Sequence, residues 1–254
     1  NTASYIPFKN SSDILDYVKN NNKKYDYFNI ITEDVASKPI RIKNIDFLYC
    51  VYTFYPNHNS GYTSRTENIS SYLKRNNVKF NITVNPYNYN YTSIHETDKY
   101  IVFPYLKESK NLYLSNIFKI LYHLYNYNTL MGASNHTIGN SISKLSGYYN
   151  LKTIYEVRGL WYITKYQRTT FYNHDEEELE INACNNNDYV FVLNYSLKTF
   201  LINKGVNENK IFVLKNSINN NINKILSNKT DYEYFFGYFG SIVDYENIIE
   251  LLFC

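Results

Sequence analysis

Three segments of the chain carry side chains suited to chemistry, and each directly follows an apolar, strand-like run. The first is YEVRGLW at residues 155–161, which places Glu156, Arg158 and the only tryptophan of the chain, Trp161, at the end of such a run. A charge at a half-buried strand end is costly unless it is paired or used in binding. An Arg158–Glu156 ion pair is the structural alternative. We interpret Arg158, Gly159 and Trp161 as functional.

The second segment is the loop YPNHNSGYTSRT at residues 55–66. Gly61 lets backbone amides approach a ligand closely, and a helix that starts after the loop supplies partial positive charge for a phosphate or a polar group. Tyr62 and Arg65 add an aromatic ring and a full positive charge. The spacing is neither that of a dinucleotide-binding fingerprint nor that of a P-loop, so an ordinary strand-to-helix turn remains the alternative.

The third segment is ASNHTIG at residues 133–139. Ser134, Asn135 and His136 can hydrogen-bond the hydroxyl groups of a sugar or another acceptor. The same residues can instead cap the helix that follows, so the pattern leaves both roles open.

Acidic residues cluster further along the chain, between residues 175 and 180. We interpret the contiguous run at residues 175–178 as a water-facing helix start that complements the helix dipole. Glu180 lies apart from that run, and Asp188 follows just before the next strand. Glu180 is therefore the better candidate for a specific role in binding.

These segments lie within a regular alternation of strand-like and helix-like patterns. Repeated strand–helix units predict a doubly wound, Rossmann-like parallel sheet, in which ligands bind outside the C-terminal ends of the strands. We expect strands at residues 45–51, 78–84, 129–133, 153–157, 189–193 and 211–214, and helices from residue 66, at 112–127, at 138–147, at 176–186, and from a cap at Ser196 through Leu201 to a stop at Gly205.

The organisation of the rest of the chain follows from composition shifts. Residues 1–40 form an N-terminal extension, and residues 41–215 form the first Rossmann-like domain. The polar, Asn-rich stretch 216–232 is interpreted as a linker. Residues 233–254 begin a second Rossmann-like domain with one strand–helix unit, which contains Gly240 and Ser241. The chain starts with Asn and stops within a helix-like pattern, so we expect a piece of a longer protein.

Composition excludes several classes of function. The 254 residues carry a net charge of +3, too weak a field to indicate a nucleic-acid partner. Three widely spaced cysteines argue against a disulfide framework and a zinc site. No apolar run is long enough to span a membrane, and the N-terminus lacks a signal-peptide pattern. We expect a cytoplasmic protein without a metal site.

Taken in order, the motifs resemble those of the family 4 glycosyltransferases, which are retaining enzymes of the GT-B fold. SGYTSRT at residues 60–66 is similar to the family's glycine loop, ASNHTIG to the loop before its fourth helix, and YEVRGLW to a signature of polysaccharide-assembly members. Glu180, the DYV strand from Asp188 and residues 205–218 follow the family's later pattern. FGYFGS at residues 236–241 resembles the start of its donor domain.

The resemblance implies transfer of a sugar, with retention, from a nucleotide-diphosphate sugar to a glycan or lipid-linked acceptor, with no cofactor or obligatory metal. It implies catalytic roles for Arg158 and His136, and donor contacts from Asn216, Gly240 and Ser241. The substrate-binding residues would be Gly61, Tyr62, Arg65, Ser134, Asn135, Gly159, Trp161 and Glu180.

Departures from the family pattern put local roles in doubt. Asn187 stands where the family has Ala, Lys215 and Ser217 replace the Pro and Gly of its domain junction, and Ser134 takes a position often held by His. The donor-side segment that holds the nucleotide sugar in the family is absent from this sequence. We therefore expect the 254-residue chain alone to be inactive or nearly so.

Two alternatives remain open at this stage. One is a sugar-nucleotide epimerase, which shares the two-domain architecture, and the other is a non-catalytic remnant that binds carbohydrate or lipid on aromatic side chains. Peripheral membrane contact is a habit of the family, but the sequence contains no basic amphipathic helix that requires it.

Overall fold

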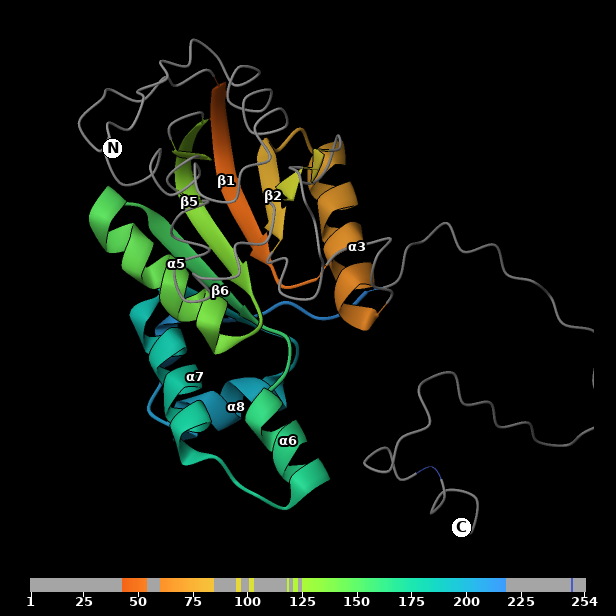
Figure 1. Cartoon of the computed structure of the whole chain (residues 1–254), viewed down its shortest axis with the longest axis vertical. Helices are drawn as coiled ribbons and strands as arrows, with labels where there is room; N and C mark the ends of the chain where they lie inside the picture. Colours follow the sequence, from red (N-terminus) through yellow and green to blue (C-terminus); the bar gives the residue numbers. More distant parts are fainter. Residues whose placement is uncertain are drawn as a thin grey trace, which may run out of the picture.

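One twisted sheet organises the chain in a computed structural model that describes residues 43–53, 60–84, 95–96, 101–102, 118, 121–122, 125–217 and 248. The strand order is β3-β4-β2-β1-β5-β6-β7-β8, and every pairing is parallel except that of β3 with β4 (Figure 1). The strands are β1 (Lys43–Val51), β2 (Phe80–Val84), β3 (His95–Glu96), β4 (Ile101–Val102), β5 (Tyr125–Ala133), β6 (Lys152–Val157), β7 (Tyr189–Val192) and β8 (Ile211–Val213).

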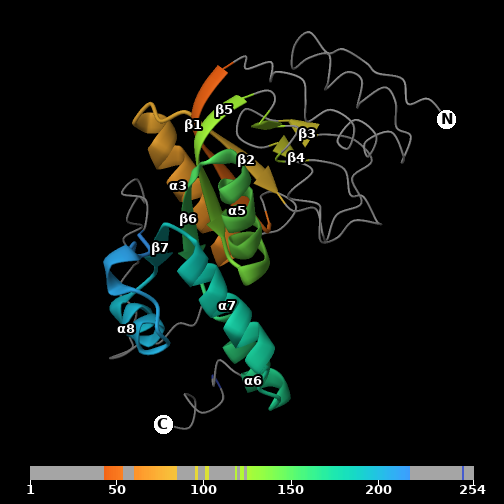
Figure 2. The same cartoon turned by 90° about the vertical axis from the view of Figure 1, so that its left-hand side faces the viewer.

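Helices cover both faces of this sheet. Helix α3 packs on one face, and α5 packs on the opposite face beside α7 (Figure 2). The described helices are α3 (Gly61–Arg75), α5 (His136–Tyr149), α6 (Trp161–Thr169), α7 (His174–Asn186) and α8 (Tyr195–Asn203), with a short 3-10 helix η1 (Glu208–Lys210).

The core consists of apolar side chains that alternate between the two sheet faces. Under α5, Leu48 and Leu130 pack against Ile142. On the other face, Tyr49 and Ile82 lie in the layer that α3 covers with Ile69. A third cluster joins β6, β7 and β8 to α7 and α8. Burial on both faces explains why the strands read as continuous apolar runs rather than as alternating ones.

The predicted Rossmann-like doubly wound sheet is confirmed, but several boundaries were wrong. Residues 125–127 belong to strand β5 and not to the helix predicted for residues 112–127. In that predicted helix, Phe118, Leu121 and Tyr122 are helical. Strand β5 pairs with β1 from Lys43 onward, and this pairing overrides the helical spacing of the tyrosines.

Two helix starts also differ from the expectation. Helix α3 begins at Gly61, because Ser60 caps it in a capping box with Thr63, so its first turn contains residues that we placed in a loop. Helix α8 is capped by Asn194 and not by Ser196. Its predicted stop at Gly205 is confirmed by a left-handed φ of 87° there.

Helix α6 was not predicted from the sequence. Helix α6 starts at Trp161 directly after the YEVRG segment, with no side-chain cap at Leu160. Its composition contains four β-branched or aromatic residues in its first turns, which are weak helix formers. Packing of Tyr162 against Tyr172 holds it in place.

Three predicted parts of the chain lie outside the described residues: the extension 1–40, most of the linker 216–232, and the second-domain start at 233–254, with its Gly240 and Ser241, apart from residue 248. Among the residues that the structure describes, no helix has the length and apolar character needed to cross a membrane.

Candidate functional site

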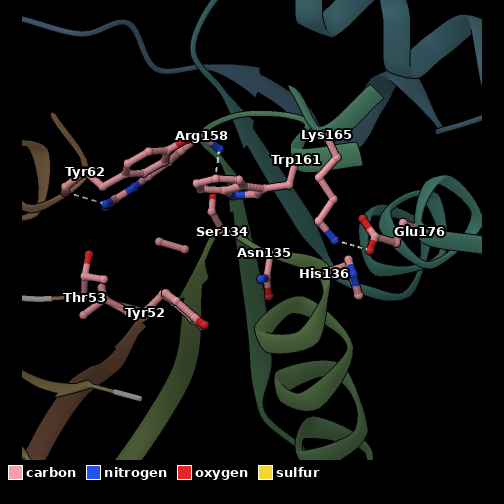
Figure 3. Close-up of a pocket in the computed structure, with 12 residues that line it drawn as sticks. Tyr52, Thr53, Tyr62, Ser134, Asn135, His136, Arg158, Trp161, Lys165 and Glu176 are labelled. Carbon is pink, nitrogen blue, oxygen red and sulfur yellow. Dashed lines mark hydrogen bonds and ion pairs between the residues drawn. The ribbon is translucent and has the colours of Figure 1, made fainter. Parts of the chain in front are cut away.

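A pocket of about 440 Å³ lies at the C-terminal edge of the sheet. It opens where β1 and β5 are neighbours, although the chain first runs from β1 to β2 on the other side. Such a switch point leaves a crevice between the connections, which is where doubly wound proteins bind ligands. The lining residues are Val51, Tyr52, Thr53, Tyr62, Ala133, Ser134, Asn135, His136, Arg158, Trp161, Lys165 and Glu176 (Figure 3).

An aromatic pair forms one wall of the pocket. The rings of Tyr62, from the first turn of α3, and Trp161, from the start of α6, are stacked with centroids 5.6 Å apart (Figure 3). Gly159 makes this approach possible, because a Cβ at that position would lie 3.0 Å from the Tyr62 hydroxyl oxygen. Trp161 is 38% exposed, so the pair offers an apolar surface to a ligand.

A buried carboxylate lies beneath that wall. Glu156 is 0% exposed at the end of β6. Its Oε2 accepts hydrogen bonds from the Tyr49 hydroxyl at 2.6 Å and from Arg158 Nε and NH2 at 3.0 and 2.9 Å. Its Oε1 accepts one from Arg65 Nε at 2.6 Å. Glu156 therefore ties three elements, β1, α3 and β6, to one point.

Arg158 uses all its donors inside the protein. Besides its bonds to Glu156, NH1 donates to the Tyr62 carbonyl at 2.8 Å and to Thr66 Oγ1 at 2.9 Å, and NH2 contacts the Tyr49 hydroxyl. The Arg158 backbone amide donates to Ser134 Oγ at 3.0 Å. The guanidinium group of Arg158 thus places a positive charge at the pocket, and its bonds hold the first turn of α3 in place.

Charge compensation keeps this cluster ionised. Burial opposes the ionisation of Glu156, but the positive charges of Arg158 and Arg65 outweigh it and lower the pKa of the carboxyl. Burial, reinforced by the negative charge of Glu156, raises the pKa of the Tyr49 hydroxyl, which stays protonated and donates. Two guanidinium groups share one carboxylate, so the cluster retains one net positive charge.

The opposite wall is the N-terminus of α5. Asn135 caps the helix by accepting from the Thr137 amide at 3.1 Å, and it lines the pocket as well. His136 is half-buried, and this burial lowers its pKa, so its imidazole is uncharged at neutral pH. An uncharged imidazole can accept a hydrogen bond or a proton from a ligand hydroxyl.

Behind this wall lies a second buried carboxylate, Glu180 of α7. It accepts from the Tyr155 hydroxyl at 2.6 Å and from the His136 amide at 3.2 Å. Burial raises its pKa to about 7, although both hydrogen bonds lower it. Glu180 fixes the start of α5 from behind and is not among the residues that line the pocket.

One ion pair closes the far side of the pocket. Lys165 of α6 contacts Glu176 in the first turn of α7, beside His136 (Figure 3). Its partner belongs to the acidic run that we assigned to water. That assignment holds for Asp175 and Glu178, which are exposed, and was wrong for two residues. Glu176 lines the pocket, and the largely covered Glu177 pairs with Lys204 and accepts from the Tyr172 hydroxyl.

The structure brings most of the predicted site residues together. Tyr62, Ser134, Asn135, His136, Arg158 and Trp161 line the pocket. Gly61, Arg65, Gly159 and Glu180 lie next to it without lining it, and Asn216 contacts Arg65.

Six lining residues were not predicted as site residues: the strand-end residues Val51 and Ala133, and Tyr52, Thr53, Lys165 and Glu176. Tyr52 and Thr53 follow β1 directly, and the rule that ligands bind beyond strand ends would have found them. Lys165 depends on α6, which was not predicted.

The fold has solved counterparts. The chain superposes on sucrose-phosphate synthase from Thermosynechococcus elongatus with a TM-score of 0.53 and 12% identity, over 68% of this chain and 49% of that one. Weaker likenesses are to Anabaena HepE in complex with UDP and glucose (TM-score 0.48, 9% identity, 69% and 45% covered) and to UDP-GlcNAc 2-epimerase from Methanocaldococcus jannaschii (0.45, 16%, 66% and 45%).

At these identities the likeness shows the fold alone. The chain spans about half the length of the solved structures that it matches. No protein-family model matches the chain, and no curated protein does so either.

Proposed function

We propose that this chain provides the acceptor-binding domain of a glycosyltransferase that uses a nucleotide-diphosphate sugar. One observation carries the proposal: at the switch point of a Rossmann-like sheet, a stacked Tyr62–Trp161 pair faces a helix start that presents Asn135 and His136. An apolar ring surface opposite hydrogen-bonding groups suits a sugar ring, which has apolar faces and polar edges.

The charges of the pocket favour a neutral acceptor. Among the lining residues, Arg158 is paired with Glu156, Lys165 is paired with Glu176, and His136 is uncharged at neutral pH. Arg65, the second guanidinium group on Glu156, does not line the pocket. A neutral glycan would bind without breaking either ion pair. An acidic acceptor would compete with Glu176 for Lys165, but this pair is largely exposed and contributes only a small part of such a preference.

The donor would approach from above the C-terminal edge of the sheet. The net positive charge shared by Arg65, Arg158 and Glu156 lies there and would favour a departing diphosphate. Assignment to family 4, retention of configuration, a role in polysaccharide assembly and a cytoplasmic, membrane-peripheral location belong to this proposal. The YEVRGLW, SGYTSRT and ASNHTIG motifs support the family assignment, and the location is proposed from the widely spaced cysteines and the habit of the family.

Trp161 makes the proposal directly testable, because it is the only tryptophan in the chain. Titration of the purified chain with glucose, N-acetylglucosamine and their disaccharides should change the tryptophan fluorescence in a saturable way, with dissociation constants on the order of 1 mM. Tyr62→Ala should weaken that binding about fivefold or more, since a stacking surface contributes about 1 kcal/mol or more. Tyr148→Ala, at an exposed position of α5, is the matched control.

The outcomes separate the candidate functions. An epimerase acts on the nucleotide sugar alone and needs no second sugar, so saturable binding of free saccharides favours the transferase, or a carbohydrate-binding remnant of one, over the epimerase. Binding of UDP-sugars with no response to any saccharide would favour the epimerase. A folded chain that responds to neither ligand would overturn the proposal.

A further inference from the structure

Arg65 connects the buried carboxylate of the site to the segment that follows the last strand. Its Nε donates to Glu156 Oε1 at 2.6 Å. Its NH2 donates to the Leu214 carbonyl at 2.9 Å, and its NH1 donates to Asn216 Oδ1 at 2.8 Å and to the Lys215 carbonyl at 3.4 Å. One side chain thus holds residues nearly 150 positions away in the sequence, where β8 has ended.

The strand order alone does not explain why residues 214–216 lie beside α3. Strand β8 is at the outer edge, four strands from β1, and neighbouring strands lie about 4.8 Å apart. The chain therefore leaves the sheet roughly 19 Å from β1. Figure 1 shows the blue segment after β8 crossing under the C-terminal edge of the sheet to the first turns of α3. Residues 214–216 cover about 10 Å of that path if extended.

One backbone hydrogen bond ties this segment to the sheet, from Leu214 N to Val192 O at 2.8 Å. Beyond it, Lys215 and Asn216 are exposed and contact α3 through Arg65. A guanidinium group suits this role, because its rigid, planar fork presents donors in several directions at once. Its charge is anchored by Glu156, whose side chain is fully buried.

We propose that Arg65 is a positioning residue that directs the chain after β8 away from the sheet edge and toward the pocket. We call residues 214–216 the junction. Glu156 binds both Arg65, which holds the junction, and Arg158, which lines the pocket, so one buried carboxylate positions the junction and the pocket wall together. The functional meaning rests on the proposed function, in which a donor-binding domain follows this junction and must face the acceptor. Arg65 would then set where that domain begins.

Substitutions of Arg65 can change the position of residues 214–216 without unfolding the chain. Arg65→Ala leaves Glu156 with Arg158 and Tyr49, so the carboxylate stays compensated and the fold should persist. The bonds of Arg65 to residues 214–216 are lost in the same variant, while the Leu214–Val192 backbone bond and the contact of Lys215 with the Tyr195 ring remain. Arg65→Lys keeps the charge, but an ammonium group is a single point that cannot reach Glu156 and the three separated junction acceptors together.

A spin-label distance measurement tests this in the 254-residue chain. Labels would be placed at exposed Ser217 and at Tyr148 of α5 after substitution by cysteine, in a Cys254→Ser background, because Cys50 and Cys184 are buried and free. The parent should give one narrow distance distribution. Arg65→Ala and Arg65→Lys should broaden it about twofold, as a short tethered segment gains freedom. Arg75→Ala, in the last turn of the same helix, is the matched control and should leave it narrow.

An unchanged, narrow distribution in a folded Arg65→Ala variant would overturn the proposal. If Arg65→Ala fails to fold, Asn216→Ala removes a junction-side acceptor without touching Glu156 and should still broaden the distribution. A narrow distribution there would count against the proposal as well. The measurement needs no saccharide, so failure of the Trp161 titration would remove the proposed function and leave this result standing.

Discussion

Glu156 and Arg158 stand two residues apart at the end of β6 and bind each other through two hydrogen bonds, of 3.0 and 2.9 Å. Strand geometry alone places them on the same face of the sheet, since side chains alternate. Both side chains are almost fully buried, and Arg158 lines the pocket while Glu156 lies beneath it. The ion pair that was the structural alternative for this segment is therefore present, and the same Arg158 also lies at the candidate binding site.

Neutralising the shared carboxylate should destabilise the chain strongly. Glu156→Gln would leave Arg158 and Arg65 facing each other without a countercharge, at a cost of about 3–5 kcal/mol in the free energy of unfolding. Urea unfolding followed by circular dichroism measures this. Glu178→Gln, at an exposed position of α7, should change the midpoint little. An unfolding midpoint for Glu156→Gln equal to that of the parent would refute the prediction.

The pH dependence of stability should carry the signature of Glu180. Its pKa is raised from 4.5 to about 7 by burial, so the native state binds a proton that the unfolded state releases. The stabilising contribution is therefore full below pH 4.5 and is lost as the pH rises through 7. Between pH 5.5 and pH 8 this group alone should lower the free energy of unfolding by about 2 kcal/mol.

Glu180→Gln isolates that contribution, because the amide cannot titrate. The difference in unfolding free energy between variant and parent should shift in favour of the variant as the pH rises from 5.5 to 8. Chemical denaturation at several pH values provides the measurement. Parallel curves for the two proteins would show that Glu180 does not titrate in this range.

Because α5 packs closely against β6 and α7, any larger residue in place of Gly139 should lower the free energy of unfolding. A Cβ there would lie 2.8 Å from Tyr155 Cε2 and 2.9 Å from Ala183 Cβ. Gly139→Ala should therefore cost about 1–3 kcal/mol through overpacking. Gly147→Ala lies on the same helix with no atom within 4 Å of the added Cβ, and it should stabilise by about 0.5–1 kcal/mol. Thermal melts of both variants decide the matter, and equal shifts would contradict the packing argument.

The stacked pair should respond to the loss of either ring. Tyr62→Ala exposes more of the Trp161 indole to water, so the fluorescence emission of the free protein should move to longer wavelength. Tyr62→Phe keeps the ring and should leave the emission close to that of the parent. An emission maximum that Tyr62→Ala does not move would mean that the two rings are not stacked in solution.

The local patterns of the sequence determined the sheet and much of the pocket. Alternating apolar runs predicted the parallel sheet, and the rule that ligands bind beyond strand ends pointed to Ser134, His136 and Arg158, which line the pocket. The sheet is confirmed and the three residues lie together, because each inference depends on residues close in sequence, where periodicity and turn chemistry carry the information.

Tertiary structure decided what local patterns cannot encode. Tyr125 to Tyr127 form a strand because β1 offers a pairing partner, and Glu176 lies at the pocket because the unforeseen helix α6 brings Lys165 to it. The bonds of Arg65 to Glu156 and to residues 214–216 join segments separated by about 90 and 150 positions. Such contacts depend on how the chain closes in space, and no local preference of Arg65 specifies them.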